Sequence, residues 1–187
     1  MNLITHFLIG WNTAVLAGVE KRDRVLITIA GVLPDIDGLG AIAEWATRNT
    51  EKPLRWFSDY HHQLAHNLTA GIIWALAVLL LAKKKASTAL AALLAFHIHL
   101  LADVLGGRGP EGFQWPIPYL YPFSPASQIT WQYQWPLDSW QNLAITVAML
   151  AMVFIVAWKK GLSPLEVFSN KADELFVRTV QKYKRNG

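Results

Sequence analysis

Long apolar runs alternate with short charged clusters along this chain. The apolar runs cover residues 1–19, 25–33, 68–82, 86–105 and 143–158. Three of them stop at clusters rich in Lys and Arg, at residues 20–24, 83–85 and 159–160. Residues 106–140 are instead rich in Gly, Pro and aromatic side chains and show no helical period. The pattern predicts an all-α fold: a membrane-embedded helical bundle with a long aromatic and Pro-rich loop.

The last segment of the chain has its own helix-start signal. Ser163-Pro164-Leu165-Glu166 matches a capping box with Pro at the first helical position. Apolar residues then recur at helical spacing, with basic residues between them. We therefore expect a membrane-associated helical domain over residues 1–162 and a basic amphipathic helix over 163–187. Such a helix suits a membrane surface; the alternative is an ordinary surface helix packed on its own domain.

Composition agrees with a membrane setting. Of the 187 residues, 53% are hydrophobic, only 16% are charged and nine are Trp, and the mean hydropathy is +0.25. Cys is absent, which excludes disulfides and thiolate metal sites. Residues 1–19 carry no Lys or Arg, so we interpret them as a retained apolar helix rather than a signal peptide.

The basic residues are unevenly distributed. Of the 17 Lys and Arg, all but Arg48, Lys52, Arg55 and Arg108 lie in residues 20–24, 83–85 and 159–187. By the positive-inside rule, this end of the bundle and the C-terminus face the cytoplasm. We therefore expect an integral membrane protein, in the inner membrane if the cell is bacterial. Because several apolar runs fall short of about 20 residues, the alternative is a soluble bundle with an unusually apolar core.

Candidate metal ligands gather at the opposite end of the bundle. Tracing the runs back and forth places seven side chains there: His6, Asp35, Asp37, His61, His66, His99 and Asp103. His99 and Asp103 are four residues apart on one helix face. An antiparallel hairpin across Lys83–Lys85 brings His66 beside His99. Nitrogen and oxygen ligands suit zinc, with manganese or magnesium as alternatives, and seven ligands leave room for two ions.

Several of these residues have simpler explanations. The Asp35-Ile36-Asp37 segment, between Pro34 and Gly38, resembles ordinary turn chemistry. His61 and His62 are also compatible with a solvated loop, and His97 with a core histidine bonded to a carbonyl. Asp103 argues for the metal, because an ionised carboxylate inside an apolar helix needs a cation and no Lys or Arg lies within one helical turn.

The order of these motifs resembles the membrane-bound, metal-dependent hydrolase family often described as LexA-regulated. The matching pieces are Thr5-His6, Leu33-Pro34-Asp35-Ile36-Asp37, His61-His62-Gln63-Leu64-Ala65-His66-Asn67, His99-Leu100-Leu101-Ala102-Asp103, Gly106-Gly107 and Tyr121-Pro122-Phe123-Ser124. The resemblance covers roughly residues 3 to 125. The third block departs from the family pattern at His62, Gln63, Ala65 and Asn67. Through a distant similarity to zinc-dependent phospholipases C and single-strand nucleases, the resemblance implies hydrolysis of a phosphoester.

The expected chemistry is attack by a metal-activated water on a phosphoester, with lipid-like substrates favoured. Either Asp35 or Asp37 is a ligand and the other a general base or a hydrogen-bond acceptor behind a ligand. Arg108 is a weaker candidate for contacting a phosphate oxygen. The aromatic loop either admits lipid or anchors the protein. The main alternative is a non-catalytic membrane protein with a structural metal; a transporter is another, and no nucleic-acid partner is expected.

Overall fold

The computed structural model describes residues 1–109, 113–124 and 126–185. It confirms the all-α prediction, with 66% of the structure helical. The helices are α1 (Leu3–Leu16), α2 (Lys21–Ala30), η1 (Leu33–Leu39), α3 (Gly40–Thr47), α4 (Trp56–Tyr60), α5 (Leu68–Leu81), α6 (Lys85–Gly106), α7 (Trp140–Lys160), η3 (Pro164–Val167) and α8 (Asn170–Arg185). Within the loop between α6 and α7, β1 (Ile117–Pro118) and β2 (Gln128–Ile129) form a short antiparallel pair.

Polar caps fix where the main helices begin. The side chains of Asn2, Asn67 and Ser139 accept hydrogen bonds from backbone N–H groups in the first turns of α1, α5 and α7. The cap at Ser139 starts α7 earlier than its apolar run, so the helix has 21 residues. Together with α6, at 22 residues, it is long and apolar enough to cross a membrane. The pair formed by α2 and η1–α3 is bent by 54° and could form a third, broken span.

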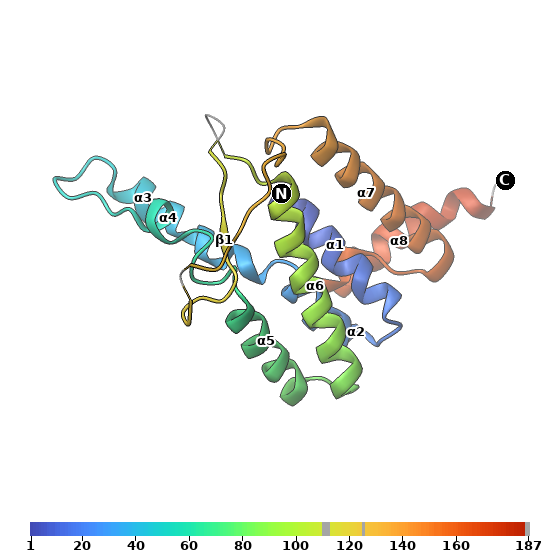
Figure 1. Ribbon diagram of the computed structural model, residues 1–187. Coiled ribbons are helices and arrows are strands. Elements are labelled where there is room, and N and C mark those ends of the chain that lie inside the picture. The colour runs from blue at the N-terminus through green and yellow to red at the C-terminus, as the bar shows by residue number, and fades with distance from the viewer. Residues whose placement is uncertain (110–112, 125, 186–187) are drawn as a thin grey trace.

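Helix α6 lies at the centre of the bundle, with α1, α2 and α5 around it (Figure 1). The buried core includes Trp11, Ile27 and Phe96. Helices α1 and α2 meet closely at two glycines, because a Cβ on Gly31 would lie only 2.7 Å from the Cα of Gly10. This contact brings the end of α2 against the first half of α1, and it sets the positions of His6 and of the Gly31 carbonyl.

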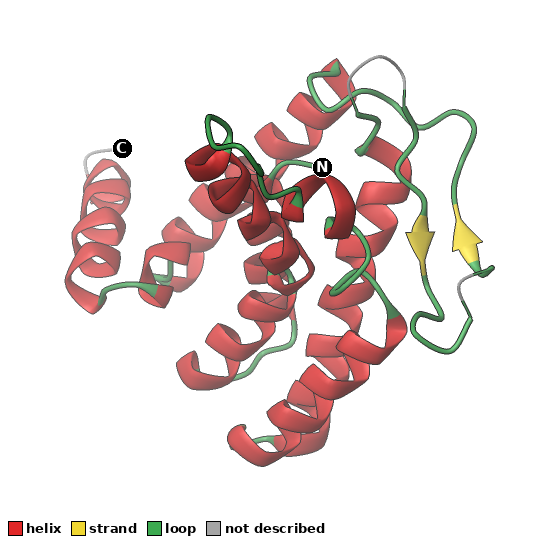
Figure 2. Cartoon of the chain, turned by 90° about the vertical axis from the view of Figure 1, so that its left-hand side faces the viewer, coloured by secondary structure: helices red, strands yellow, loops and turns green. Residues whose placement is uncertain are grey.

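The other segments gather at one end of the bundle. Helices α3 and α4 extend to one side as an arm, and the loop carrying β1 and β2 runs along the bundle (Figures 1 and 2). Side chains from this loop and from α7 fix the end of α6, since Gln134 donates to the Asp103 carbonyl at 2.7 Å and Asn142 to the Gly106 carbonyl at 2.9 Å. The antiparallel α5–α6 hairpin predicted from the sequence is present.

Two local predictions were wrong. Residues 34–38 do not form a simple turn but lie within the 3₁₀ helix η1, with Pro34 in its first turn. Ser163 and Glu166 do not form a capping box, because the Glu166 carboxylate turns inward and pairs with Arg24. The long C-terminal helix therefore begins only at Asn170. It packs on α7, with Phe176 against Phe154 at 5.5 Å between ring centroids.

Candidate metal centre

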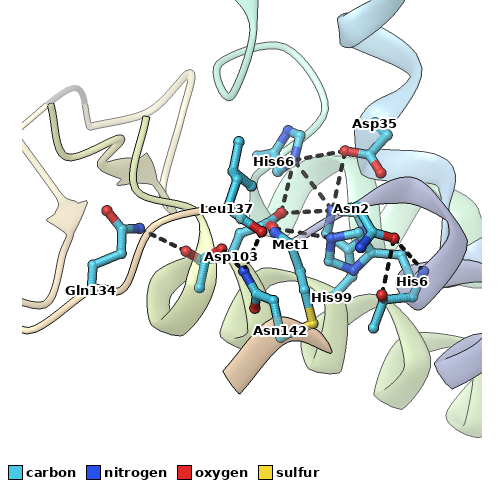
Figure 3. Close-up of polar contacts among 12 residues, drawn as sticks. Met1, Asn2, His6, Asp35, His66, His99, Asp103, Gln134, Leu137 and Asn142 are labelled. Carbon is cyan, nitrogen blue, oxygen red and sulfur yellow. Dashed lines mark hydrogen bonds and ion pairs between the residues drawn. The ribbon is translucent and has the colours of Figure 1, made fainter. Parts of the chain in front are cut away.

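Four segments of the chain bring imidazole and carboxylate groups to one point inside the bundle (Figure 3). His6 comes from α1, Asp35 from η1, His66 from the loop before α5, and His99 and Asp103 from successive turns of α6. The sequence predicted that these five would meet, and they do. Asp103 is the common partner, with ion-pair contacts to all three imidazoles and to the amino group of Met1.

The spacing of the donor atoms suits a metal ion. His66 Nε2 lies 3.3 Å from His99 Nε2 and 3.4 Å from Asp103 Oδ2. Asp35 Oδ1 lies 3.9 Å from His66 Nε2 and 3.7 Å from His99 Nε2. His99 Nε2 lies 2.9 Å from Asp103 Oδ2. Two ligands of a tetrahedral zinc ion are about 3.4 Å apart, since each lies about 2.1 Å from the ion. The observed separations bracket that value.

The centre is buried and incompletely satisfied. The side chains of His6, His66 and His99 are fully buried and that of Asp103 is 3% exposed, whereas Asp35 is 21% exposed. Among the described residues of the centre, three buried polar atoms have no hydrogen-bond partner, His6 Nδ1, Asp35 Oδ2 and His62 Nδ1, and Asp103 Oδ2 has only its close contacts with the imidazoles of His66 and His99. Unpartnered polar atoms are rare in protein interiors because burial removes their water. A divalent ion fits this donor set, because Asp35 Oδ1, His66 Nε2, His99 Nε2 and Asp103 Oδ2 converge at the spacing of metal ligands.

Groups behind the imidazoles orient them. His99 Nδ1 lies 2.9 Å from the Gly31 carbonyl, which requires the Nδ1–H tautomer and leaves Nε2 free to bind an ion. His66 Nδ1 lies 3.1 Å from Asp37 Oδ2, with the same consequence. Asp37 also holds His61, whose Nδ1 lies 2.9 Å from Asp37 Oδ1. Asp37 and His61 therefore lie behind His66 rather than in the ring of donors. This arrangement is typical of the carboxylates that support metal-binding histidines.

The two histidines of the loop respond differently to their surroundings. Burial opposes protonation of His66, but hydrogen bonds and charges from Asp103 and Asp37 outweigh it and raise its pKa to about 9. Burial, reinforced by the nearby His66, lowers the pKa of His62 to about 2. Without a metal, the His66 imidazole is therefore protonated and its charge is balanced by the carboxylates of Asp37 and Asp103. His62 is a neutral imidazole.

His62 is the site residue that sequence reasoning missed. Its side chain is buried, its backbone φ is +66°, and it forms a close group of potential ligands with His66 and Asp103. The sequence did contain a signal, because His62 adjoins His61 and lies four residues before His66. The same pattern, however, also fits a solvated loop.

Two other polar residues, His97 and Arg108, lie outside the group of potential metal ligands. His97 bonds the Leu93 carbonyl at 2.8 Å through Nδ1 and the Tyr119 hydroxyl at 2.9 Å through Nε2. It is the carbonyl-bonded histidine that the sequence analysis considered. Arg108 donates from Nη2 to the Gln132 carbonyl at 3.2 Å, so its guanidinium is turned toward the aromatic loop.

A pocket of about 490 Å³ adjoins the donor cluster. It is lined by residues of α4, the 61–63 loop and the aromatic loop: Phe57, Ser58, His61, His62, Gln63, Phe113, Trp115, Pro116, Pro118, Tyr121 and Gln128. His62 also belongs to the group with His66 and Asp103. Part of the predicted aromatic loop thus forms a wall beside the buried centre.

The chain as a whole is similar to a known protein family. The model of one protein family, the YdjM inner membrane protein family, matches residues 1–172. The chain belongs to this family. No curated protein and no solved structure matches the chain. Membership in the YdjM family confirms the prediction of a membrane protein, and α6 and α7 are the helices best suited to span the bilayer. The YdjM description names no reaction, so hydrolysis stays a prediction.

Proposed function

We propose that this protein is a membrane-bound, metal-dependent hydrolase that cleaves a phosphoester, with lipid-like substrates favoured. The observation that carries the proposal is the position of His62, which belongs to a buried ligand group and also lines a pocket. A structural metal site is closed on all sides, whereas a catalytic one keeps an open position. Zinc suits the nitrogen and oxygen donors, and manganese or magnesium are alternatives.

The chain's own residues divide the work. When bound, a divalent ion would supply Lewis-acid chemistry and lower the pKa of a coordinated water toward about 7. His99 and Asp103 would hold the ion, with His6, His66 and Asp35 around them. Asp35 Oδ1 faces His66 and His99, whereas its Oδ2 is buried without a hydrogen-bond partner, so we assign Oδ2 as the atom that would accept a proton. Asp37 orients His66.

The pocket supports a lipid-like substrate. Its described lining contains Phe57, Phe113, Trp115 and Tyr121 but no Lys or Arg. Such walls favour an uncharged or amphipathic group, and the charge of a phosphoester would be balanced at the metal. In a membrane protein, lipid is the amphipathic phosphoester at hand.

The distribution of charge supports one orientation in the membrane. We propose that the metal centre faces away from the cytoplasm and that α8 lies on the cytoplasmic side. Because the chain has no Cys, single cysteines give clean labels. A Cys at Ser127, in the aromatic loop, should react with an impermeant reagent in intact cells, and a Cys at Ser87, beside the triple lysine, should not. The reverse labelling would invert the orientation.

The experiment for the reaction is a chelator-controlled hydrolysis screen. Purified protein loaded with zinc or manganese should cleave lipid phosphoesters faster than soluble ones, and a chelator should abolish the activity. Asp35→Asn should slow turnover, and His97→Ala should behave as the wild type. If metal-loaded protein is inert toward the whole panel, the deep burial of His6, His66 and His99 would favour the structural-metal alternative instead.

A further inference from the structure

The potential ligands fall into two groups that share one carboxylate. His6, Asp35, His99 and Asp103 form one group, and His62, His66 and Asp103 form the other. In each group the ligand atoms all lie within 4.8 Å of one another. The rings pair in the same way: His6 stacks on His99 at 3.7 Å between centroids, and His62 lies against His66 at 4.2 Å.

Asp103 is placed to serve both groups. Its Oδ1 lies 3.0 Å from His6 Nε2, and its Oδ2 lies between the two groups, 2.9 Å from His99 Nε2 and 3.4 Å from His66 Nε2. A carboxylate whose oxygens contact imidazoles of both groups can bridge two ions, as in sites where paired ions lie about 3.5–4 Å apart. The side chain cannot turn freely, because it is buried and its carboxylate contacts the imidazoles of His6, His66 and His99.

His62 carries two unfavourable features that an ion would offset. A φ of +66° is uncommon for a residue with a side chain, and such strain concentrates at functional sites. Its ring is buried against His66 and Trp115, yet Nδ1 has no hydrogen-bond partner. A loop that only connected α4 to α5 would have no reason to hold a histidine in this way.

We propose that the centre binds two metal ions bridged by Asp103. The first site, with His6, Asp35, His99 and Asp103, has four protein ligands and is closed. The second, with His62, His66 and Asp103, has three and keeps one position open. Among these six side chains, His62 alone also lines the 490 Å³ pocket, so we place the open position on the pocket side. The existence of the second site does not depend on the proposed function, but its role in catalysis rests on that function.

Zinc stoichiometry tests the proposal. Purified wild-type protein, freed of metal and titrated with Zn²⁺ alone, should take up two ions per chain. His62→Gly should take up one, because it removes the imidazole while glycine adopts φ +66° readily. His97→Ala is the matched control and should take up two. Metal-free His62→Gly should unfold at the same temperature as the metal-free wild type or higher, which would exclude misfolding as the cause of the loss.

The competing arrangement is a single ion held by Asp35, His66, His99 and Asp103, whose mutual distances also permit it. Saturation of the wild type at one zinc, or two zincs in His62→Gly, would overturn the proposal. The failure of the proposed function looks different. If the protein binds two zinc ions but hydrolyses nothing, the second site stands and the proposed hydrolase is wrong. If it binds one zinc ion and hydrolyses a phosphoester, the hydrolase stands and the second site is wrong.

Discussion

The two ends of this bundle both bury charged side chains, but they treat them in opposite ways. At the basic end, Asp23 accepts hydrogen bonds from two backbone N–H groups and from Thr88, and the Arg24 guanidinium forms a two-pronged pair with Glu166. Trp11 also donates to Glu166. None of the atoms in these three charged groups is among the described buried atoms that lack a partner.

At the other end, among the described residues, three potential ligand side chains have a buried atom without a partner, His6, Asp35 and His62, and Asp103 Oδ2 contacts only imidazoles. The chain can therefore satisfy buried charge fully where charge serves the fold. Although the Met1 amino group pairs with Asp103, the unpartnered imidazole and carboxylate atoms at this end indicate a site for a cation that the chain does not itself provide. Variants at the basic end should accordingly lower the stability of the fold, and variants at the ligand end should lower the metal content.

The largest expected effect is on stability at the basic end. Glu166→Ala leaves Arg24 buried without its carboxylate, since the guanidinium side chain is only 11% exposed. Breaking such a pair costs about 3–5 kcal/mol. Unfolding in detergent should show this loss while the metal content stays unchanged. Lys83→Ala is the control, because its pair with Glu20 is exposed and contributes about 1 kcal/mol or less. Equal losses in the two variants would contradict the distinction.

A second effect is stabilisation by metal. An ion that binds only the folded protein, present at a hundredfold excess over its dissociation constant, stabilises it by about 2.7 kcal/mol. Chelation should therefore lower the unfolding temperature of the wild type, and much less that of Asp103→Ala. A wild type indifferent to chelator would mean that the ligand end needs no ion.

Asp37 should show an intermediate effect on binding. It touches His66 and His61 but lies behind them, and loss of such a support typically weakens metal binding about 10–100-fold. A zinc titration of Asp37→Asn should give that weaker affinity with an unchanged number of ions. Complete loss of an ion would make Asp37 a ligand instead.

The smallest effect, counted per pH unit, is a pH dependence of zinc binding. Without metal, His66 keeps its proton up to a pKa of about 9, so binding below that pH must release it. Competition from one proton weakens zinc affinity about tenfold for each pH unit below 9, and the affinity should level off above it. Titrations at pH 6, 7 and 8 would measure the slope. A flat profile would remove His66 from the ligands.

Much of this arrangement was readable from the sequence. Apolar runs bounded by lysines gave the helices, and the near-equal distances from His66 and Asp103 to Lys83–Lys85 gave the hairpin that joins His66 to His99. The structure places Asp37 and His61 behind His66 rather than among the donors, and their assignment as ligands stays a prediction that metal binding has to test. Helical spacing shows which residues share a face, but it cannot show which of the two carboxylates, Asp35 or Asp37, faces the other donors.

Other features depend on contacts between distant segments. Glu166 looked like part of a cap because the local motif fits one, yet it pairs with Arg24, 142 residues earlier. His62 looked like a loop residue because nothing in its neighbours reveals a left-handed backbone. In both cases tertiary contacts outweighed the local pattern.

The central claim is that the ligand end is a metal centre, and metal content measures it most directly. Elemental analysis of purified wild type, His99→Ala, Asp103→Ala and His97→Ala should find bound metal in the first and last proteins and a marked loss in the other two. The His97 ring faces Tyr119, away from the donors. Full metal content in both His99→Ala and Asp103→Ala, in folded protein, would contradict the account.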